Sequence, residues 1–291
     1  MLGAWGPEDL LGTRPGLRPS GALDKKQKGT ISMQLIGKGK SAEVFQYNEG
    51  KVLKLFFNDF SINDIKYEYL LMSSINQLNI NAPMCYGTIS LENRNGLLYE
   101  YAKGVSLLSL IIQKPLRVKQ YAHLLAREHA KMHAHTCTTL PSEKERFSKQ
   151  IERSKERIGH QYNGLMEQIS KVNSETFVYH GDFHPDNILV DNSDISIIDW
   201  MNSYSGTRAG DSARTYLMII SPSVPDEFPK ALLPMLKILK IKLATTYLNE
   251  YQKITGITKK EINSWMKIIA AVRLCDNIPG EEDWLLKIIN E

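Results

Sequence analysis

One polar segment places the tightest limit on what this chain can fold into. Residues 180–200 read HGDFHPDNILVDNSDISIIDW, so a loop crowded with polar residues is followed by two short apolar runs. The runs ILV and ISII have the length and composition of strands, and the turn-forming residues DNSD between them predict a hairpin. Because a hairpin brings its ends together, we expect Asn187 and Asp199 to lie at one end of it.

Three side chains of this segment match the needs of phosphoryl transfer. That reaction needs a carboxylate to orient the attacking hydroxyl and accept its proton, and oxygen ligands to hold Mg²⁺ against the phosphates. We predict Asp182 as the base and Asn187 and Asp199 as the Mg²⁺ ligands, since Mg²⁺ prefers hard oxygen donors. The alternative is a surface turn around a hairpin. It explains residues 191–194 but not the loop HGDFHPDN.

The chain on either side of this segment predicts an α+β protein. Short β-branched or aromatic runs separated by turns predict strands at 31–37, 42–47, 51–57, 85–90 and 96–102. Residues 61–78 interrupt them with helical spacing of apolar residues. After Tyr101 two apolar stripes predict helices, one formed by Tyr121, Leu124, Leu125 and Met132 and the other by Phe147, Ile151, Ile158, Tyr162, Leu165 and Ile169.

This change of character predicts the domain organisation. We expect a disordered or non-native leader at 1–29, a nucleotide-binding N-lobe at 30–101 and a C-lobe at 102–291 that carries the catalytic loop, the metal ligands and the acceptor site. A connector at 100–106 would join the lobes. Two lobes that share a connector form a cleft, which is a favoured place for a ligand.

A glycine-rich turn in the N-lobe is a candidate phosphate cradle. Gly37, Gly39 and Ser41 lie in GKGKSAEVF, between two predicted strands. Glycines let the backbone approach a phosphate without a Cβ clash. An ordinary hairpin turn explains the same residues, and the downstream motif favours the cradle.

A lysine in the next strand needs an anionic partner. Alternation places Val52, Lys54 and Phe56 on one face of the strand, and a lysine among apolar neighbours requires a phosphate or a carboxylate. Glu68 on the following helix can supply the carboxylate. The alternatives are an edge-strand lysine that reaches water and a plain surface glutamate.

Residues 97–104 are expected to lead into the connector. Backbone groups from Glu100 to Ala102 would then meet the base of the nucleotide. Either ATP or GTP is compatible with these residues.

The segment as a whole resembles a known family. HGDFHPDNILV and IIDW resemble the catalytic loop and metal-binding motif of the aminoglycoside phosphotransferase and choline-kinase-like family. The resemblance implies a protein-kinase-like two-lobed fold, with a small antiparallel β-rich N-lobe containing one helix and a larger, mainly helical C-lobe. It implies that Asp182 is the catalytic aspartate and that Asn187 and Asp199 bind magnesium. Asp186 departs from the family, where many members have glycine, and it either changes metal affinity or faces solvent.

The resemblance also points to an acceptor site lined by the helical lobe. Asp211 matches a family aspartate that supports the loop after the metal motif, and a helix N-cap is a compatible alternative. Asp211 and Asp276 are candidate substrate residues. Carboxylates near Asp276 would attract an amine-bearing acceptor such as an aminoglycoside or choline. For residues 281–283, the acidic start of a helix is the favoured alternative.

Two histidines on one predicted helix face were tested as a metal site. His129 and His133 lie in EHAKMHAH, which is not the HExxH pattern, and no third ligand follows at a fixed spacing. We therefore expect satisfied or exposed histidines.

Composition sets outer limits. A formal net charge of +4 with dispersed Lys and Arg argues against nucleic acid as a partner, and three widely separated cysteines argue against disulfides. The absence of a long apolar run or a signal-like N-terminus predicts a cytoplasmic protein with no membrane partner. The expected partners are a nucleotide and a small hydroxylated acceptor. The sequence leaves the oligomeric state open.

Two other functions compete with a small-molecule kinase. A nucleotide-binding pseudokinase would be expected to have lost at least one of the catalytic loop, the metal ligands and Lys54, and all are present. A protein kinase shares the spacing of Asp182 and Asn187, but IIDW stands where DFG would be, and no APE follows.

Overall fold

The computed structural model describes the chain in two compact units. One comprises the described residues up to Gly104 together with Leu189–Met201, and the other comprises Val105–Ile188 and Asn202–Glu291. The segment 189–201, which the sequence assigned to the C-lobe, clusters with the first unit. Described residues are all except 1–32, 40, 92, 174 and 225–229, so the predicted leader and Lys40 of the glycine-rich turn lie outside them.

The first unit contains a five-stranded antiparallel sheet in the order β1-β2-β3-β5-β4. Each strand overlaps one of the runs predicted from alternation and turns. Their bounds are β1 Gln34–Lys38, β2 Ala42–Asn48, β3 Lys51–Phe56, β4 Cys85–Leu91 and β5 Arg94–Glu100.

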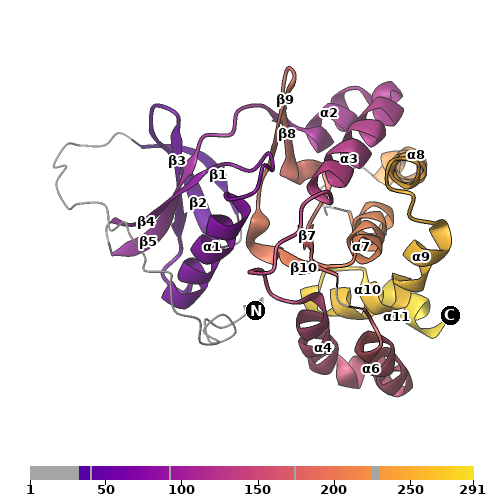
Figure 1. Cartoon of the computed structure of the whole chain (residues 1–291). Coiled ribbons are helices and arrows are strands. Elements are labelled where there is room, and N and C mark those ends of the chain that lie inside the picture. Colours follow the sequence, from indigo (N-terminus) through magenta and orange to yellow (C-terminus); the bar gives the residue numbers. More distant parts are fainter. Residues whose placement is uncertain (1–32, 40, 92, 174, 225–229) are drawn as a thin grey trace. The chain divides into compact units, whose positions relative to one another are not determined.

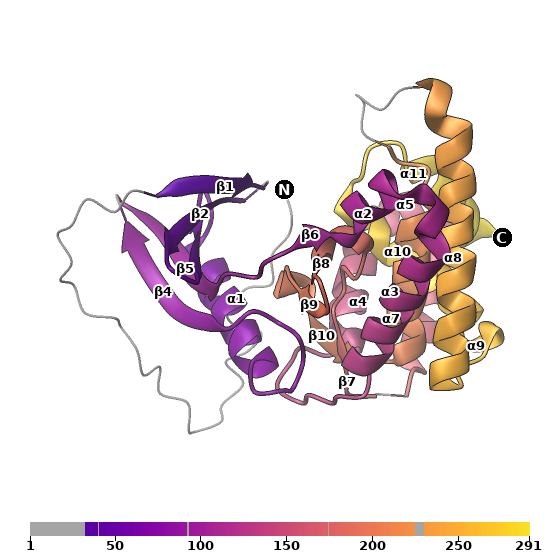
Figure 2. The same cartoon turned by 90° about the horizontal axis from the view of Figure 1, so that it is seen from above.

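Helix α1 (Ile62–Ile75) covers this sheet and completes its core (Figures 1 and 2). It begins after Ser61, whose hydroxyl accepts from the Asn63 N–H and satisfies one free amide of the first turn. Its apolar face buries Ile65 against Phe56 and Leu97 of the sheet. The prediction of a helix between strands is confirmed.

The first unit also contains the hairpin predicted after the catalytic loop. Strands β8 (Ile188–Asp191) and β9 (Asp194–Ile197) are neighbours in a sheet and are joined by two residues. Gly104 packs closely against the backbone of Val190. Its φ of 118° and the collision that a Cβ would make with the Val190 carbonyl both require glycine there.

The second unit is mainly helical. Its short strands are β6 Val105–Ser106, β7 Phe177–Tyr179 and β10 Tyr204–Gly206, of which β7 and β10 pair with each other. Its α-helices are α2 Leu107–Gln113, α3 Val118–Met132, α4 Glu143–Arg153, α5 Lys155–Ile158, α6 Tyr162–Ser170, α7 Arg208–Ile220, α8 Leu233–Thr255, α9 Lys259–Ser264, α10 Met266–Arg273 and α11 Glu282–Asn290. Short 3₁₀ turns lie at Pro115–Arg117, Gly159–Gln161, Pro185–Asn187, Trp200–Asn202, Lys230–Leu232 and Leu274–Asp276.

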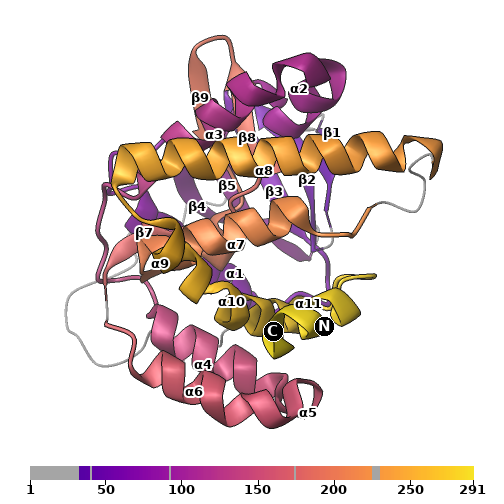
Figure 3. The same cartoon turned by 90° about the vertical axis from the view of Figure 1, so that its right-hand side faces the viewer.

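The long helix α8 organises this unit. It packs along α3 and α7, and Figure 3 shows it running above α7. The apolar stripe from Phe147 to Ile169, in contrast, is divided among α4, α5 and α6. Gly159, with a φ of 63°, ends α5, because a residue with positive φ cannot continue an α-helix.

Among the described residues, no helix combines the length and the apolar character that a bilayer crossing requires.

Candidate functional site

The predicted catalytic loop begins directly after β7 in the second unit. The chain turns at Gly181, whose φ is 75°, and a Cβ there would collide with the Asn202 carbonyl oxygen. The tight turn therefore requires glycine. It is followed by Asp182, whose own N–H donates to the ring nitrogen Nδ1 of His180 at 3.2 Å.

Asn187 is bound to the same loop. Its side-chain Nδ2 donates to the Asp182 carbonyl oxygen at 2.9 Å and lies 3.4 Å from the Asp182 carboxylate oxygen Oδ2. Within the described chain, the Asn187 amide oxygen Oδ1 receives no hydrogen bond. Asn187 therefore orders the loop with its nitrogen and keeps a hard oxygen donor available for a cation.

His184 completes this cluster. Its Nδ1 accepts from the Asp186 N–H at 3.2 Å, and its Nε2 lies 3.6 Å from the Asp182 Oδ2. Burial alone would raise the pKa of Asp182, but the neighbouring His184 and the charge of Arg214 outweigh it and hold the pKa well below its usual range. The carboxylate is therefore ionised at neutral pH, as a proton acceptor must be.

The first unit holds the other predicted residues around Lys54. The ammonium of Lys54 donates to both carboxylate oxygens of Glu68, at 2.7 and 3.0 Å, and lies 4.0 Å from the Asp199 Oδ1. Burial lowers the pKa of Lys54, but the carboxylates of Glu68 and Asp199 outweigh it, so the pKa lies above its ordinary value. The predicted pair is present, and it keeps Lys54 charged.

Asp199 has an unusual backbone conformation. Its φ is 64°, in the left-handed region that few residues other than glycine adopt, and its side chain is 52% exposed. The carboxylate is therefore directed to solvent rather than into the core, where a metal ion could reach it.

At the two glycines of the predicted phosphate cradle, neither the backbone conformation nor close packing requires glycine. Neither Gly37 in β1 nor Gly39 after it is among the described residues with positive φ. A Cβ on either would come no closer than 3.7 Å to another part of the chain. Ser41 directly precedes β2, and its carbonyl accepts from the Phe57 N–H at 2.9 Å.

The connector residues differ in how their amides are used. The Glu100 N–H donates to the Met84 carbonyl at 2.8 Å, and the Tyr101 N–H donates to the Gly50 carbonyl at 2.9 Å. The Ala102 N–H has no such partner in the described part of the chain, so it is the amide that a ligand could use.

The two candidate substrate aspartates both have partners within the second unit. Asp211 is the fourth residue of α7, and Thr207 rather than Asp211 is the N-cap of that helix. Asp211 has no exposed surface, which favours support of the loop over contact with an acceptor. Asp276 lies 3.0 Å from Arg214 and 3.6 Å from Arg273.

The acidic residues after Asp276 are also matched by arginines. Glu281 is buried in a two-point pair with Arg273, at 2.6 and 2.8 Å, and Glu282 pairs with Arg157 at 2.8 Å. Glu282 and Asp283 form the first turn of α11, as the helix-start interpretation expected.

Arg214 is the residue that the sequence analysis missed. Its Nε donates to the Gly181 carbonyl, and its other guanidinium nitrogen pairs with Asp276. It therefore links the turn beside Asp182 to the end of α10. The sequence feature that could have identified Arg214 is its position one helical turn after Asp211, on the same face of α7.

The two histidines of the EHAKMHAH segment are satisfied by hydrogen bonds, as predicted. His129 and His133 are buried, and each has a hydrogen-bond partner at both ring nitrogens, so they are satisfied rather than exposed. Asp186, the departure from the family pattern, has an exposed side chain.

Known structures share this fold. Amicoumacin kinase hAmiN, in complex with AMP-PNP, Ca²⁺ and Ami, is 14% identical, covers 90% of this chain and 88% of its own, and has a TM-score of 0.56. The streptomycin–ATP ternary complex of APH(2")-IIa is 15% identical over 88% of this chain and 92% of its own, with a TM-score of 0.53. Choline kinase from Cryptosporidium parvum Iowa II is 17% identical over 91% and 88%, with a TM-score of 0.53. No curated protein sequence matches the chain.

These likenesses confirm the predicted fold class, an α+β protein-kinase-like fold whose first unit carries the antiparallel sheet and whose second is mostly helical. The family model that matches the chain gives its class, that of the phosphotransferases. Residues 32–237, more than half of the chain, match the family described as the phosphotransferase enzyme family. The chain belongs to this family.

Proposed function

We propose that this protein moves the γ-phosphate of ATP or GTP to a hydroxyl group of a small molecule, with Mg²⁺ as the cofactor. The observation that carries the proposal is the loop around Asp182. The Asp182 carboxylate is ionised and partly exposed. The side-chain amide of Asn187 donates to the backbone carbonyl of Asp182 and so holds this residue in place. This is the arrangement that a proton acceptor for an attacking hydroxyl requires.

The donor sets fit magnesium. Asn187 and Asp199 offer an amide oxygen without a hydrogen-bond partner in the described chain and an exposed carboxylate, both of which are hard ligands. In the sequence only the β8–β9 hairpin and a few flanking residues separate them. Bound there, the ion would neutralise charge on the transferring phosphate.

Lys54 is proposed to bind the phosphates of the nucleotide. Its charge is secured by Glu68, and its side chain is 19% exposed, so it can also approach an anion. Gly37 and Gly39 support the same role, because a Cβ at either position would make only ordinary contact with the chain, so the chain itself does not require glycine there. We further propose that the Glu100 carbonyl and the Ala102 N–H meet the base.

The acceptor is proposed to be a neutral or only weakly cationic hydroxyl compound. The sequence suggested that acidic residues near Asp276 attract an amine, but Asp276, Glu281 and Glu282 are each matched by an arginine. The similar structures include a streptomycin complex of APH(2")-IIa and a choline kinase, so both acceptor classes belong in a test.

A transfer screen tests the proposal. The full chain is incubated with Mg²⁺ and ATP or GTP against aminoglycosides, choline, sugars and amino-alcohols, and phosphorylated products are detected by mass spectrometry. We expect a product with at least one acceptor and none when Mg²⁺ is removed by a chelator. Nucleotide binding without transfer to any acceptor would instead favour a pseudokinase.

A further inference from the structure

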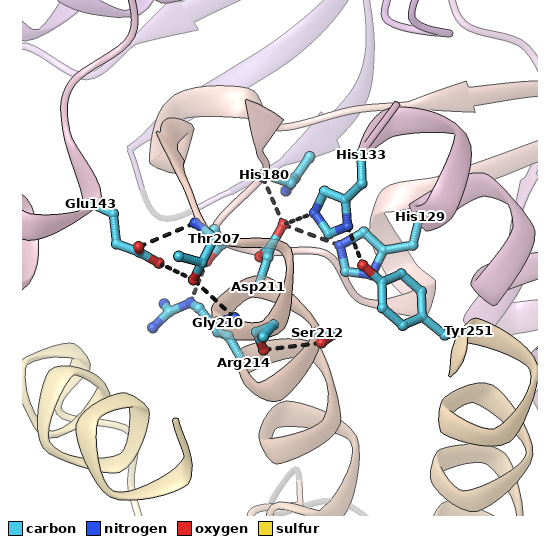
Figure 4. A network of polar contacts seen from close by, with 12 residues as sticks. His129, His133, Glu143, His180, Thr207, Gly210, Asp211, Ser212, Arg214 and Tyr251 are labelled. Atoms are coloured by element: carbon cyan, nitrogen blue, oxygen red, sulfur yellow. Dashed lines mark hydrogen bonds and ion pairs between the residues drawn. The ribbon is translucent and has the colours of Figure 1, made fainter. Parts of the chain in front are cut away.

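Behind the catalytic loop, the second unit contains a buried polar cluster that the reaction itself does not use (Figure 4). Its members are His129 on α3, His133 at the C-cap of α3, Asp211 on α7, and Tyr247 and Tyr251 on α8. All five are fully or almost fully buried. Most buried polar groups are hydrogen-bonded, and in this cluster only Asp211 Oδ1 has no partner among the described residues, so the pattern of donors and acceptors can be worked out from the other contacts.

The Asp211 carboxylate oxygen Oδ2 is the centre of the cluster. It lies 3.1 Å from His129 Nε2 and 3.2 Å from His133 Nε2, and it accepts from the His180 backbone N–H at 3.0 Å. The hydrogen bonds from both histidines outweigh burial and hold the pKa of Asp211 well below its usual range. An ionised carboxylate can only accept, so each histidine carries its proton on Nε2.

The other ring nitrogens agree with this assignment. The Nδ1 of His129 lies 2.6 Å from the Tyr247 hydroxyl, and the Nδ1 of His133 lies 2.6 Å from the Tyr251 hydroxyl. In a neutral ring with Nε2 protonated, Nδ1 is an acceptor, and the tyrosine hydroxyl is in position to donate to it. Burial and the neighbouring His133 lower the pKa of His129 to about 3, so this ring is neutral.

A metal ion is the competing explanation for these residues. His129, His133 and Asp211 could each offer one ligand atom, all within 4.8 Å of one another. A closed structural zinc site has four ligands, and a three-ligand catalytic site keeps an open position. The described residues supply three ligand atoms here, one fewer than a closed structural site has. All three residues are buried, so the fourth position that a catalytic site leaves open would not be exposed to solvent.

The cluster reaches the catalytic loop at two points. Asp211 holds the backbone N–H of His180, two residues before Asp182. The ring of His129 stacks on Phe183, directly after Asp182, with the ring centroids 4.0 Å apart. The two contacts therefore lie on either side of the proposed base along the chain.

We infer that His129 and His133 are positioning residues, which donate from Nε2–H to Asp211 and thereby hold the loop that carries Asp182. The inference rests on the proposed transfer function. His133 is the sharper test, because it contacts Asp211 while His129 also touches the loop through Phe183.

Two substitutions at His133 separate positioning from packing. His133→Gln keeps an N–H that can donate to Asp211, and His133→Leu keeps volume without a donor. Loss of alignment lowers the rate by about 10²-fold for a misplacement of about 1 Å. We expect His133→Leu to lower kcat by about this factor with an unchanged KM for the nucleotide, and His133→Gln to retain most of kcat. Equal losses in both folded variants, or none in His133→Leu, would overturn the inference.

A spectroscopic measurement separates this inference from the proposed function. Nitrogen-15 NMR of the wild-type rings should show protonated Nε2 and unprotonated Nδ1 at both histidines, and hydrogen exchange at the His180 amide should be slow. Both results are independent of transfer activity and of whether a variant folds. Protonated Nδ1, rapid exchange at His180, or one bound zinc per chain would each overturn the inference.

Discussion

The two units stabilise a buried carboxylate in different ways. In the first unit, Glu68 is paired with the cation of Lys54 and accepts a hydrogen bond from the Tyr99 hydroxyl at 2.7 Å. In the second unit, Asp211 is surrounded by two histidines and the His180 backbone N–H, and no lysine or arginine in the described chain pairs with it. One arrangement contains the cation of a lysine, and the other consists of two histidine rings and a backbone N–H.

The difference corresponds to different tasks. Lys54 is partly exposed and lies near Asp199, so its charge can attract an incoming phosphate while the lysine stays paired with Glu68. The donors around Asp211 have no exposed surface and can only hold what they already contact. Substitution of Lys54 should therefore change nucleotide use, and substitutions around the buried carboxyl groups of the second unit should change stability or kcat.

Lys54→Met is expected to have the largest effect. Removing one preorganised charge-stabilising donor lowers the rate by roughly 10²–10³-fold. We expect a loss of this size in kcat/KM for the nucleotide, measured by transfer kinetics. Lys66→Met on the exposed face of α1 is the matched control. Equal kinetics for the two variants would remove Lys54 from the proposed site.

Glu143→Gln tests a third way of holding a buried carboxyl group. Glu143 accepts from the N–H and the hydroxyl of Thr207 at the start of α7, both at 3.1 Å, without a cation. Burial raises the pKa of Glu143 to about 8, from an ordinary value of 4.5. The folded state therefore binds a proton that the unfolded state has released between these values, and the stability that this proton contributes falls as pH rises from 4.5 to about 8.

The variant should lack this pH dependence. We expect wild type to lose up to about 1.4 kcal/mol of unfolding free energy per pH unit relative to Glu143→Gln in that window. Urea unfolding at several pH values measures it, with Glu145→Gln on the exposed face of α4 as the control. Parallel curves for wild type and Glu143→Gln would show that Glu143 is ionised in the folded protein.

Tyr99→Phe is expected to have the smallest effect. It removes the hydroxyl that donates to Glu68 but leaves the ion pair with Lys54, so we expect a loss of about 1 kcal/mol in unfolding free energy. Urea unfolding at one pH measures this, with Tyr86→Phe at the exposed end of β4 as the control. If Tyr99→Phe lost as much unfolding free energy as Lys54→Met does in the same urea experiment, the hydroxyl would stabilise Glu68 as much as the cation does.

Local patterns explain why much of the fold could be predicted. The strands at 42–47, 51–57 and 85–90 have turns at their ends and the composition of strands, and they are observed with small shifts in their bounds. The Lys54–Glu68 pair followed from a lysine among apolar neighbours. The single stripe from Phe147 to Ile169 was misleading, because a periodic pattern does not show the break at Gly159.

The support for the catalytic loop could not be predicted in this way. His129 and Asp211 are 82 residues apart in the sequence, and Arg214 lies 33 residues from the Gly181 carbonyl that it holds. These contacts depend on how α3, α7 and α8 pack, which periodicity within one helix does not determine. The two buried histidines were recognised as satisfied, but their partners came only from the structure.

Transfer by an Asp182→Asn variant is the most direct test of the account. The amide has nearly the same shape as the carboxylate but cannot take the proton, and loss of a general base lowers the rate by roughly 10²–10⁴-fold. We predict a fall of this size in kcat with unchanged nucleotide binding, while Asp194→Asn at the exposed turn of the β8–β9 hairpin keeps wild-type turnover. Wild-type turnover by a folded Asp182→Asn variant would contradict the account.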